Sequence, residues 1–278
     1  MTDPTFGSAW SASLARVPEA LLREWLAFAL EVCDVADEIA MRHFRRDLDI
    51  ERKPDRTFVT IADRGIEHEI RGRITNRYPG HGLVGEEYGT EAGEAATRWY
   101  IDPIDGTHNY IRGIPVFATL LAVEHEGEIQ VGVISAPAMR ERWFAYRGGG
   151  AWSRGLDGER RIRVSGVAAV EDAQLLFGSH GDTVASGLMP GFDAVIASAW
   201  RDRGFGEFWS YALVAEGAAE AMAETGMSSW DLAAPMVIIE EAGGRLTDVN
   251  GERRIDAPSC VGSNGVLHDE ILARLRGA

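Results

Sequence analysis

The sequence predicts a mixed α and β protein, with an α+β first half and an α/β second half. Apolar residues recur at three and four positions across residues 18–44, which indicates a long amphipathic helix. Two apolar runs at 117–123 and 129–135 flank a short polar turn, which indicates an antiparallel hairpin. Short apolar runs then alternate with helical patterns, as in α/β layers. We expect two subdomains, 1–155 and 156–278.

The first half begins with residues 1–16, which are small and polar and predict a loose leader before the long helix. RKPDRTFVT predicts a turn that leads into a strand around Phe58. Asp63 is placed to cap a second helix, which Pro79 ends. The patterns that follow predict a short strand in LVGEEYG (83–89), a mobile linker in TEAGEAAT (90–97), a strand in WYIDPI (99–104), the hairpin and a strand at 142–146.

The second half shows the alternation more regularly. In chain order the patterns predict a strand at 175–179, helices at 187–199 and 209–218, a strand at 219–223, a helix at 230–242, strands at 245–248 and 260–263, and a helix at 267–276. The helix at 230–242 ends at a glycine pair, which is a common stop signal. No repeats or low-complexity segments interrupt this order.

Composition narrows the function. The 278 residues carry a net charge of −15, which argues against a nucleic-acid backbone as the main partner and fits a carboxylate site that a metal neutralises. The two cysteines, Cys33 and Cys260, match no zinc spacing and predict free thiols in a reducing compartment. The N-terminus lacks the pattern of a signal peptide, and no run of about 18 apolar residues is present. We expect a soluble, cytoplasmic protein.

Acidic residues gather where predicted strands and a helix end or begin. Glu86 ends one strand, Asp102 and Asp105 end another, and Asp231 lies in the first turn of a helix. Mg²⁺ prefers carboxylate and carbonyl oxygens, and the carbonyl of Ile104 lies between the two aspartates. Taken alone, DPID also fits a plain turn, and a first-turn aspartate also fits a favourable partner for the helix dipole.

Gly106 and Thr107 follow the two aspartates directly. A glycine lets backbone amides approach an anion, and the first amides of a helical turn have no intrahelical acceptor. Thr107 would cap that turn, or it would orient or deprotonate a water beside the aspartates. The second role needs an acceptor for the hydroxyl proton, and Asp63 is a candidate.

Three motifs together carry a family resemblance. GEE at 85–87, DPIDGT at 102–107 and WDLAA at 230–234 resemble, in this order and spacing, the signatures of the inositol monophosphatase-like family. The resemblance extends from KPDRTFVTIAD (53–63) to GSNGVLHDEIL (262–272). It implies a layered αβαβα sandwich and a Mg²⁺-dependent phosphomonoesterase, with a homodimer as the expected assembly.

The resemblance also implies roles for individual residues. The metal ligands, for two or three Mg²⁺ ions, would be Glu86, Asp102, the carbonyl of Ile104, Asp105 and Asp231. Gly106 and Thr107 would bind the phosphate. Thr107, Asp63 and Glu86 would form the catalytic group, with Thr107 and Asp63 polarising the attacking water. Most of these ligands lie in the first predicted subdomain, and Asp231 lies in the second.

The alcohol side of the substrate depends on other residues. Glu224 lies where family members contact substrate hydroxyls, although a solvated strand-end glutamate is the alternative. The segment FGEFWSY (205–211) places Glu207 among aromatic residues, where the family usually has small ones. An acidic and aromatic wall suits a cationic ring, such as that of L-histidinol phosphate. His108 would contact substrate at the rim or lie on a helix surface.

The rest of the chain is similar to the actinobacterial histidinol-phosphatase branch of this family, notably in IRGIPVFATLLA, SAPAMRERWFAYRGGGAW and FWSYALVAEGAAE. We therefore expect histidinol phosphate as substrate. The alternatives are an inositol-1-phosphate phosphatase, a fructose 1,6-bisphosphatase or a nucleotide 3′-phosphatase. A further alternative is a non-catalytic binding protein on the same fold, and the complete acidic set argues against it.

Overall fold

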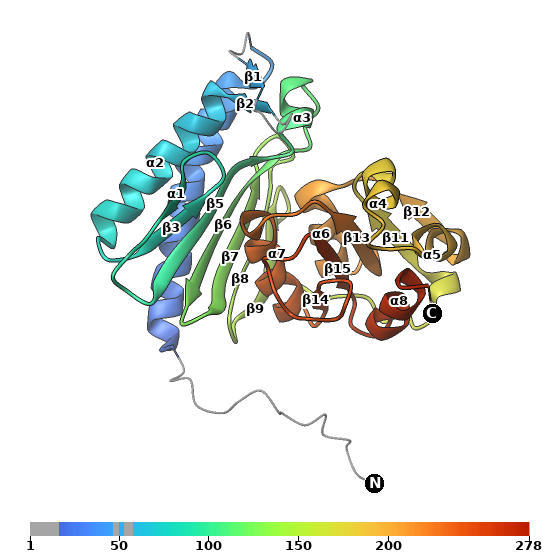
Figure 1. Ribbon diagram of the computed structural model, residues 1–278. Helices are drawn as coiled ribbons and strands as arrows, with labels where there is room; N and C mark the ends of the chain where they lie inside the picture. The colour runs from blue at the N-terminus through green and yellow to red at the C-terminus, as the bar shows by residue number, and fades with distance from the viewer. Residues whose placement is uncertain (1–16, 47–49, 53–57, 278) are drawn as a thin grey trace.

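Two helices form the first layer of the fold. The computed structural model describes residues 17–46, 50–52 and 58–277, so the predicted leader at 1–16 and part of the turn before Phe58 lie outside it. Helix α1 (Glu19–His43) buries the apolar stripe that its periodicity predicts, and α2 (Ile61–Arg77) packs beside it. Both helices lie over one face of a sheet (Figure 1).

The start of α2 differs from the prediction. Thr60, and not Asp63, is the N-cap: its hydroxyl accepts from the amides of Ala62 and Asp63. Asp63 returns the bond, since its Oδ2 accepts from the Thr60 amide at 2.8 Å. This reciprocal pair is a capping box, which fixes the Asp63 side chain as well as the helix start.

The second layer is a sheet of eight strands within the described residues, here called the first sheet. Its order is β10-β9-β8-β7-β6-β5-β3-β4. All neighbours are antiparallel except β3 and β5, which are parallel. The strands are β3 (Gly82–Gly85), β4 (Gly89–Glu91), β5 (Thr97–Asp105), β6 (Ala118–His125), β7 (Glu128–Ala136), β8 (Glu141–Tyr146), β9 (Gly150–Gly155) and β10 (Gly158–Ile162).

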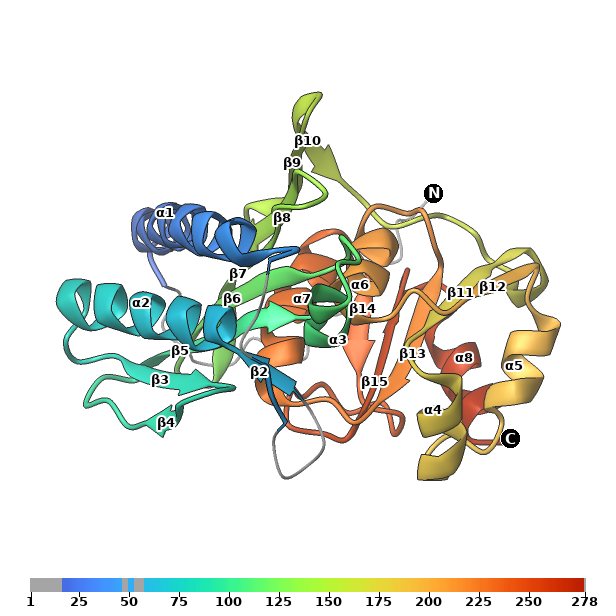
Figure 2. The same ribbon diagram turned by 90° about the horizontal axis from the view of Figure 1, so that it is seen from above.

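The first sheet confirms the predicted hairpin as β6 and β7 and corrects one segment. The segment 90–97 is not all linker, because Gly89–Glu91 pairs with β3 and Thr97 already belongs to β5. The sheet also continues past residue 155, since β10 pairs with β9 in a hairpin that extends beyond the layers (Figure 2). A short pair, β1 (Ile50–Arg52) and β2 (Phe58–Thr60), precedes α2.

The third layer consists of two helices in the middle of the molecule. Helices α6 (Glu207–Ala215) and α7 (Ser229–Glu241) lie between the two sheets (Figure 1). Residues 232–239 of α7 are all buried, so this helix has no solvent face over those turns. It packs on β6 and β7 on one side and on β14 on the other. A helix buried all round takes its position from both sheets at once.

The fourth and fifth layers complete the αβαβα sandwich. Within the described residues the second sheet has the order β12-β11-β13-β15-β14, with β11 parallel to β12 and β13 and the remaining pairs antiparallel. Its strands are β11 (Gln174–Phe177), β12 (Arg201–Arg203), β13 (Ala221–Thr225), β14 (Arg245–Thr247) and β15 (Ser259–Ser263). Helices α4 (His180–Ser186), α5 (Phe192–Ser198) and α8 (His268–Leu275) cover its outer face.

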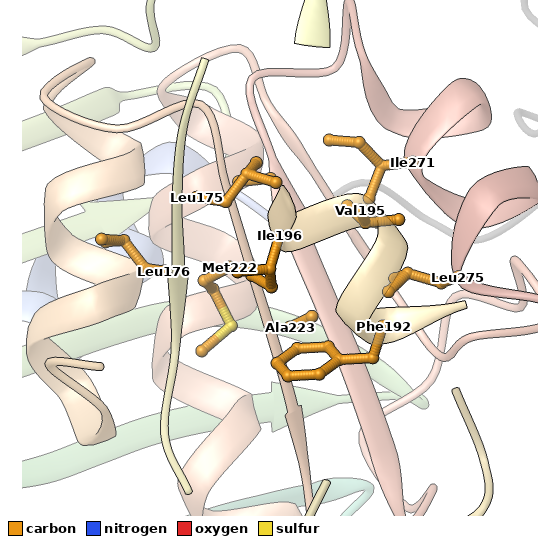
Figure 3. A pocket seen from close by; sticks show the side chains of 10 residues that line it. Leu175, Leu176, Phe192, Val195, Ile196, Met222, Ala223, Ile271 and Leu275 are labelled. Carbon is orange, nitrogen blue, oxygen red and sulfur yellow. The ribbon is translucent and has the colours of Figure 1, made fainter. Parts of the chain in front are cut away.

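The second half also corrects one prediction. The helix expected at 187–199 is shorter, since only Phe192–Ser198 is helical as α5. Gly187 takes a left-handed conformation that ends the preceding helix α4, and Pro190 lies between the two helices. Helix α4 was not predicted. Strand β12 was not predicted. Under α5 and α8 lies a small cavity of about 10 Å³, lined by apolar side chains such as Leu175, Val195 and Ile271 (Figure 3). That is room for about one water and offers no polar group to a ligand.

Two further expectations concern the environment of the chain. Cys33 and Cys260 are both buried free thiols, and burial raises the pKa of each thiol above its usual range. In the part of the chain that the structure describes, no helix combines the length and the apolar character needed to cross a membrane.

His268 at the start of α8 is a buried polar anchor. Thr247 uses its hydroxyl proton on the Asp248 carbonyl, so His268 Nε2 donates to Thr247 Oγ1 at 2.9 Å. His268 Nδ1 then accepts from Ser263 Oγ at 2.7 Å. Burial, with a smaller effect of Arg245, lowers the pKa of His268 to about 4. The folded state therefore holds a neutral imidazole.

This anchor predicts a pH-dependent stability. Between pH 6.5 and 4 the unfolded chain binds a proton on His268 that the folded chain does not, so stability falls as pH falls. We expect this residue to remove about 2 kcal/mol of unfolding free energy between pH 7 and pH 5. Urea unfolding at the two pH values measures this: the unfolding free energy of His268→Gln should fall by about 2 kcal/mol less than that of the wild type. His180→Gln, at an exposed histidine, is the control; equal pH dependence in all three proteins would contradict the assignment.

Candidate active site

A bulge at the end of β5 brings two aspartates to one side of the strand. Residues three apart in a regular strand point to opposite faces. Between Asp102 and Asp105, however, β5 advances three residues while β6 advances only two, from Leu120 to Ala118. The extra residue on β5 compensates for the alternation. DPID is therefore the irregular end of a central strand, and its proline falls where the pairing is interrupted.

A third aspartate comes from the middle layer. Asp231 is the third residue of α7, and its Oδ2 accepts from the Ser228 amide at 2.7 Å in a second capping box. Asp102, Asp105 and Asp231 each offer an oxygen within 4.8 Å of the others. The structure thus brings together aspartates from two elements that are more than 120 positions apart.

Glu86 completes the group from the end of β3. Its amide donates to the carbonyl of Ile101, at 3.2 Å, which fixes it beside β5 one residue before Asp102. The charge of Glu86 raises the pKa of Asp102 and of Asp231, so its carboxylate lies near both. All four predicted carboxylate ligands therefore face one region.

The electrostatics of this region call for a cation. Burial first, and then the charges of Glu86, Asp105 and Asp231, raise the pKa of Asp102 well above its usual range. Burial and like charges raise the pKa of Asp105 as well, and burial raises that of Asp231 to about 6. Among the described residues, the buried Asp102 Oδ1 has no hydrogen-bond partner. A set of oxygen donors with one unsatisfied fits a hard divalent cation.

The Gly106–Thr107 turn lies directly beside these carboxylates. Gly106 has φ +83°, a left-handed conformation that lets α3 (Thr107–Ile111) begin immediately after the strand. Thr107 Oγ1 lies 2.9 Å from the Ile104 carbonyl oxygen and 3.3 Å from Asp63 Oδ1. Burial raises the pKa of Asp63 to about 6. The structure therefore brings Thr107, Asp63 and the Ile104 carbonyl together.

The start of α6 forms another wall of the site. The amide of Phe208 donates to Asp105 Oδ2 at 2.6 Å, which places Glu207 next to this aspartate. Burial raises the pKa of Glu207, and the charge of Glu207 raises that of Asp105. Phe205 and Trp209 pack against each other with ring centroids 4.6 Å apart. An acidic and aromatic surface thus begins at a metal-ligand candidate.

Glu224 and His108 lie in contrasting environments. Burial, with the charges of Glu207 and Asp231, raises the pKa of Glu224 to about 8, and its buried Oε2 has no hydrogen-bond partner in the described chain. Glu224 is therefore not a solvated strand-end residue. His108 is exposed, and its ring packs edge-on against Phe58 of β2, 5.4 Å between centroids. No contact joins it to the acidic group.

The sequence reasoning missed three contributors. Thr60 holds Asp63, the amide of Phe208 binds Asp105, and Glu67 on α2 accepts from the amides of Glu87 and Tyr88. The TxxD spacing of residues 60–63 was a usable signal for the first. A backbone amide leaves no signal in the sequence. The pairs Glu67–Arg71 and Glu69–Arg73 have the same spacing, so the sequence does not single out Glu67.

The chain is similar to known proteins over most of its length. The model of the inositol monophosphatase family matches residues 21–278. The histidinol-phosphatase of Mycobacterium tuberculosis is 45% identical over 90% of this chain and 97% of its own, and that of Streptomyces coelicolor is 42% identical over 90% and 96%. The solved structure of an IMPase from Thermotoga maritima is 31% identical, with a TM-score of 0.82 over 91% of this chain and 97% of that one.

Repulsion within the acidic group predicts a gain in stability when a charge is removed. In a chelator at pH 8, Asp102→Asn should raise the free energy of unfolding by roughly 1–3 kcal/mol, because one of several buried like charges disappears. Thermal or urea unfolding measures this. Asp248→Asn is the matched control: Asp248 is also buried, but its Oδ1 accepts from two backbone amides, so its loss should destabilise. Destabilisation by both variants would contradict the repulsion.

Proposed function

This chain belongs to the inositol monophosphatase family and is a phosphomonoester hydrolase, and from this premise we propose that its substrate is L-histidinol phosphate. The observation that carries the proposal is the pair of half-buried carboxylates, Glu207 and Glu224, beside Asp105. Both have raised pKa values, and Glu207 also raises that of Asp105. A substrate that brings its own ammonium group complements such a wall.

The proposed cofactor is Mg²⁺, held by Glu86, Asp102, Asp105, Asp231 and the Ile104 carbonyl. When bound, the metal supplies Lewis-acid charge to the phosphoryl oxygens and increases the acidity of water. The unsatisfied Asp102 Oδ1 and the purely oxygen donor set support this choice. The four carboxylates come from β5, α7 and the turn that follows β3, and the two sheets hold these segments in place.

Thr107 and Asp63 are the proposed proton relay. Thr107 has one hydroxyl proton, which it donates in a hydrogen bond either to the Ile104 carbonyl or to Asp63 Oδ1. When Asp63 receives it, the threonine oxygen presents a lone pair that accepts a proton from the attacking water. Asp63 suits this role because Thr60 occupies its other oxygen, Oδ2, and fixes its orientation. The phosphate would lie against the amides that follow Gly106.

The alcohol part of the substrate would lie against α6. We infer that Glu207 and Glu224 bind the ammonium and imidazole groups, while Phe205 and Trp209 provide a face for a flat cationic ring. The similarity to two histidinol-phosphatases at 42–45% identity supports this substrate. Inositol 1-phosphate is the second candidate, because the unsatisfied Glu224 Oε2 would also accept from a sugar hydroxyl.

A substrate panel tests the proposal. Phosphate release from histidinol phosphate should exceed that from inositol 1-phosphate in kcat/KM by at least tenfold, because only the first brings a positive charge to the acidic wall. Activity should require Mg²⁺ and disappear in excess chelator. Fructose 1,6-bisphosphate and a nucleoside 3′-phosphate complete the panel. A higher kcat/KM for inositol 1-phosphate would overturn the substrate, and full turnover in chelator would overturn the metal.

Glu207 has its own expected effect. Glu207→Gln removes a charge-assisted hydrogen bond, so KM for histidinol phosphate should rise about tenfold or more. Inositol 1-phosphate is the control, because its alcohol carries no positive charge and should show a much smaller change. Steady-state kinetics on both substrates gives the comparison. An equal rise in KM for the two esters would place Glu207 outside the alcohol pocket.

A further inference from the structure

We propose that Glu67 is a positioning residue that, together with Arg71, holds the loop of Glu86 in place for metal binding. The inference rests on the metal site of the proposed function. Glu67 lies on α2, and its side chain is 0% exposed although it carries a charge. A buried carboxylate is costly unless every oxygen finds a donor. The hydrogen bonds of the Glu67 carboxylate show which segment it positions.

Both oxygens of Glu67 are directed at the loop after β3. Oε2 accepts from the Glu87 amide at 2.7 Å, and Oε1 accepts from the Tyr88 amide at 3.2 Å. These are the two amides that directly follow Glu86. Because each oxygen already has a donor, Glu67 itself is a poor metal ligand. Its role is to bind backbone.

Arg71 closes the arrangement from the next turn of α2. Its Nε donates to Glu67 Oε1 at 2.8 Å, and its Nη2 donates to the Gly89 carbonyl. Its guanidinium also lies over the Tyr88 ring, 5.9 Å from the centroid. The ion pair is almost fully buried, with the Arg71 side chain 12% exposed. Together the two side chains hold residues 87–89, which we call the ligand loop.

Helix α2 packs closely against the end of β3. A Cβ at Gly85 would lie 2.0 Å from Glu67 Oε1 and 2.9 Å from Arg71 Nη2, so any other residue there would displace the ion pair. On its other side, the amide of Glu86 is bonded to Ile101 of β5. Strand β5 therefore holds the amide of Glu86, and helix α2 holds the two amides that follow it.

The same helix face serves both functional groups. Asp63 and Glu67 are four residues apart on α2, so their side chains point the same way. Asp63 reaches Thr107 at 3.3 Å, and Glu67 reaches the ligand loop. Helix α2 therefore sets the position of Glu86 relative to Thr107 and Asp63. Residues that orient metal ligands in this indirect way typically change metal affinity 10–100-fold when they are replaced.

The test is the Mg²⁺ affinity of Glu67→Gln in the otherwise intact protein, measured by calorimetry at a temperature where the protein is folded. A glutamine offers only one acceptor oxygen to the two amides, so we expect the Kd for Mg²⁺ to rise at least tenfold. Hydrogen exchange at the amides of Glu87 and Tyr88 should accelerate in chelator. The matched control is Glu69→Gln, which breaks the same i,i+4 pair with Arg73 at an exposed site.

A second variant tests the proposal if the loss of the buried Glu67 charge unfolds the protein. Glu67→Asp retains the charge but shortens the side chain by one methylene, so it should weaken Mg²⁺ binding in the same direction. Folded variants that lose melting temperature in chelator while keeping the wild-type Kd would show a purely structural role and overturn the proposal. A wild-type protein that binds no Mg²⁺ would overturn the metal site as well, which separates the two failures.

Discussion

The site depends on one electrostatic constraint: four carboxylates must be held near one another, at the end of a sheet and mostly away from water. Burial and mutual repulsion raise the pKa of Asp102, Asp105 and Asp231. Left to themselves, such groups would move apart or take up protons. The chain prevents the first by placing each carboxylate on a backbone that other contacts already fix, and the raised pKa values are the cost of holding the groups together. In the proposed metal site, a divalent cation would find its ligands preorganised.

The layered fold supplies those fixed backbones. The bulge of β5 turns two aspartates to one side, the capping box of α7 holds Asp231, and the Glu67–Arg71 pair holds the loop after Glu86. None of these devices touches the reacting atoms. Each uses a backbone amide or a strand pairing, which are the least adjustable parts of a protein. The stability of the two sheets and of α7 is therefore what keeps the repelling groups together.

The sequence predicts the chemistry of this site better than its scaffolding, and the reason is physical. Motifs such as DPIDGT consist of side chains that the chemistry demands, so three of them in order carry a family resemblance, although DPID alone also fits a plain turn. The apolar spacing predicts a helix from residue 187, but α5 begins only at Phe192, after Gly187 and Pro190. Glu67 and Glu69 each precede an arginine by four residues, and only burial distinguishes them. The Phe208 amide that binds Asp105 could not be predicted, since every residue but proline has such a group.

That last contact links the two halves of the substrate site. Phe208 donates its amide to Asp105, while its neighbour Glu207, held at a left-handed φ of +47°, raises the pKa of the same aspartate. In the proposed function, the start of α6 would therefore both select the alcohol and contribute to the charge around a metal ligand. A change of substrate through this segment also changes the electrostatics of Asp105. If both proposals hold, substrate choice and metal binding cannot vary independently, because one turn of backbone serves both.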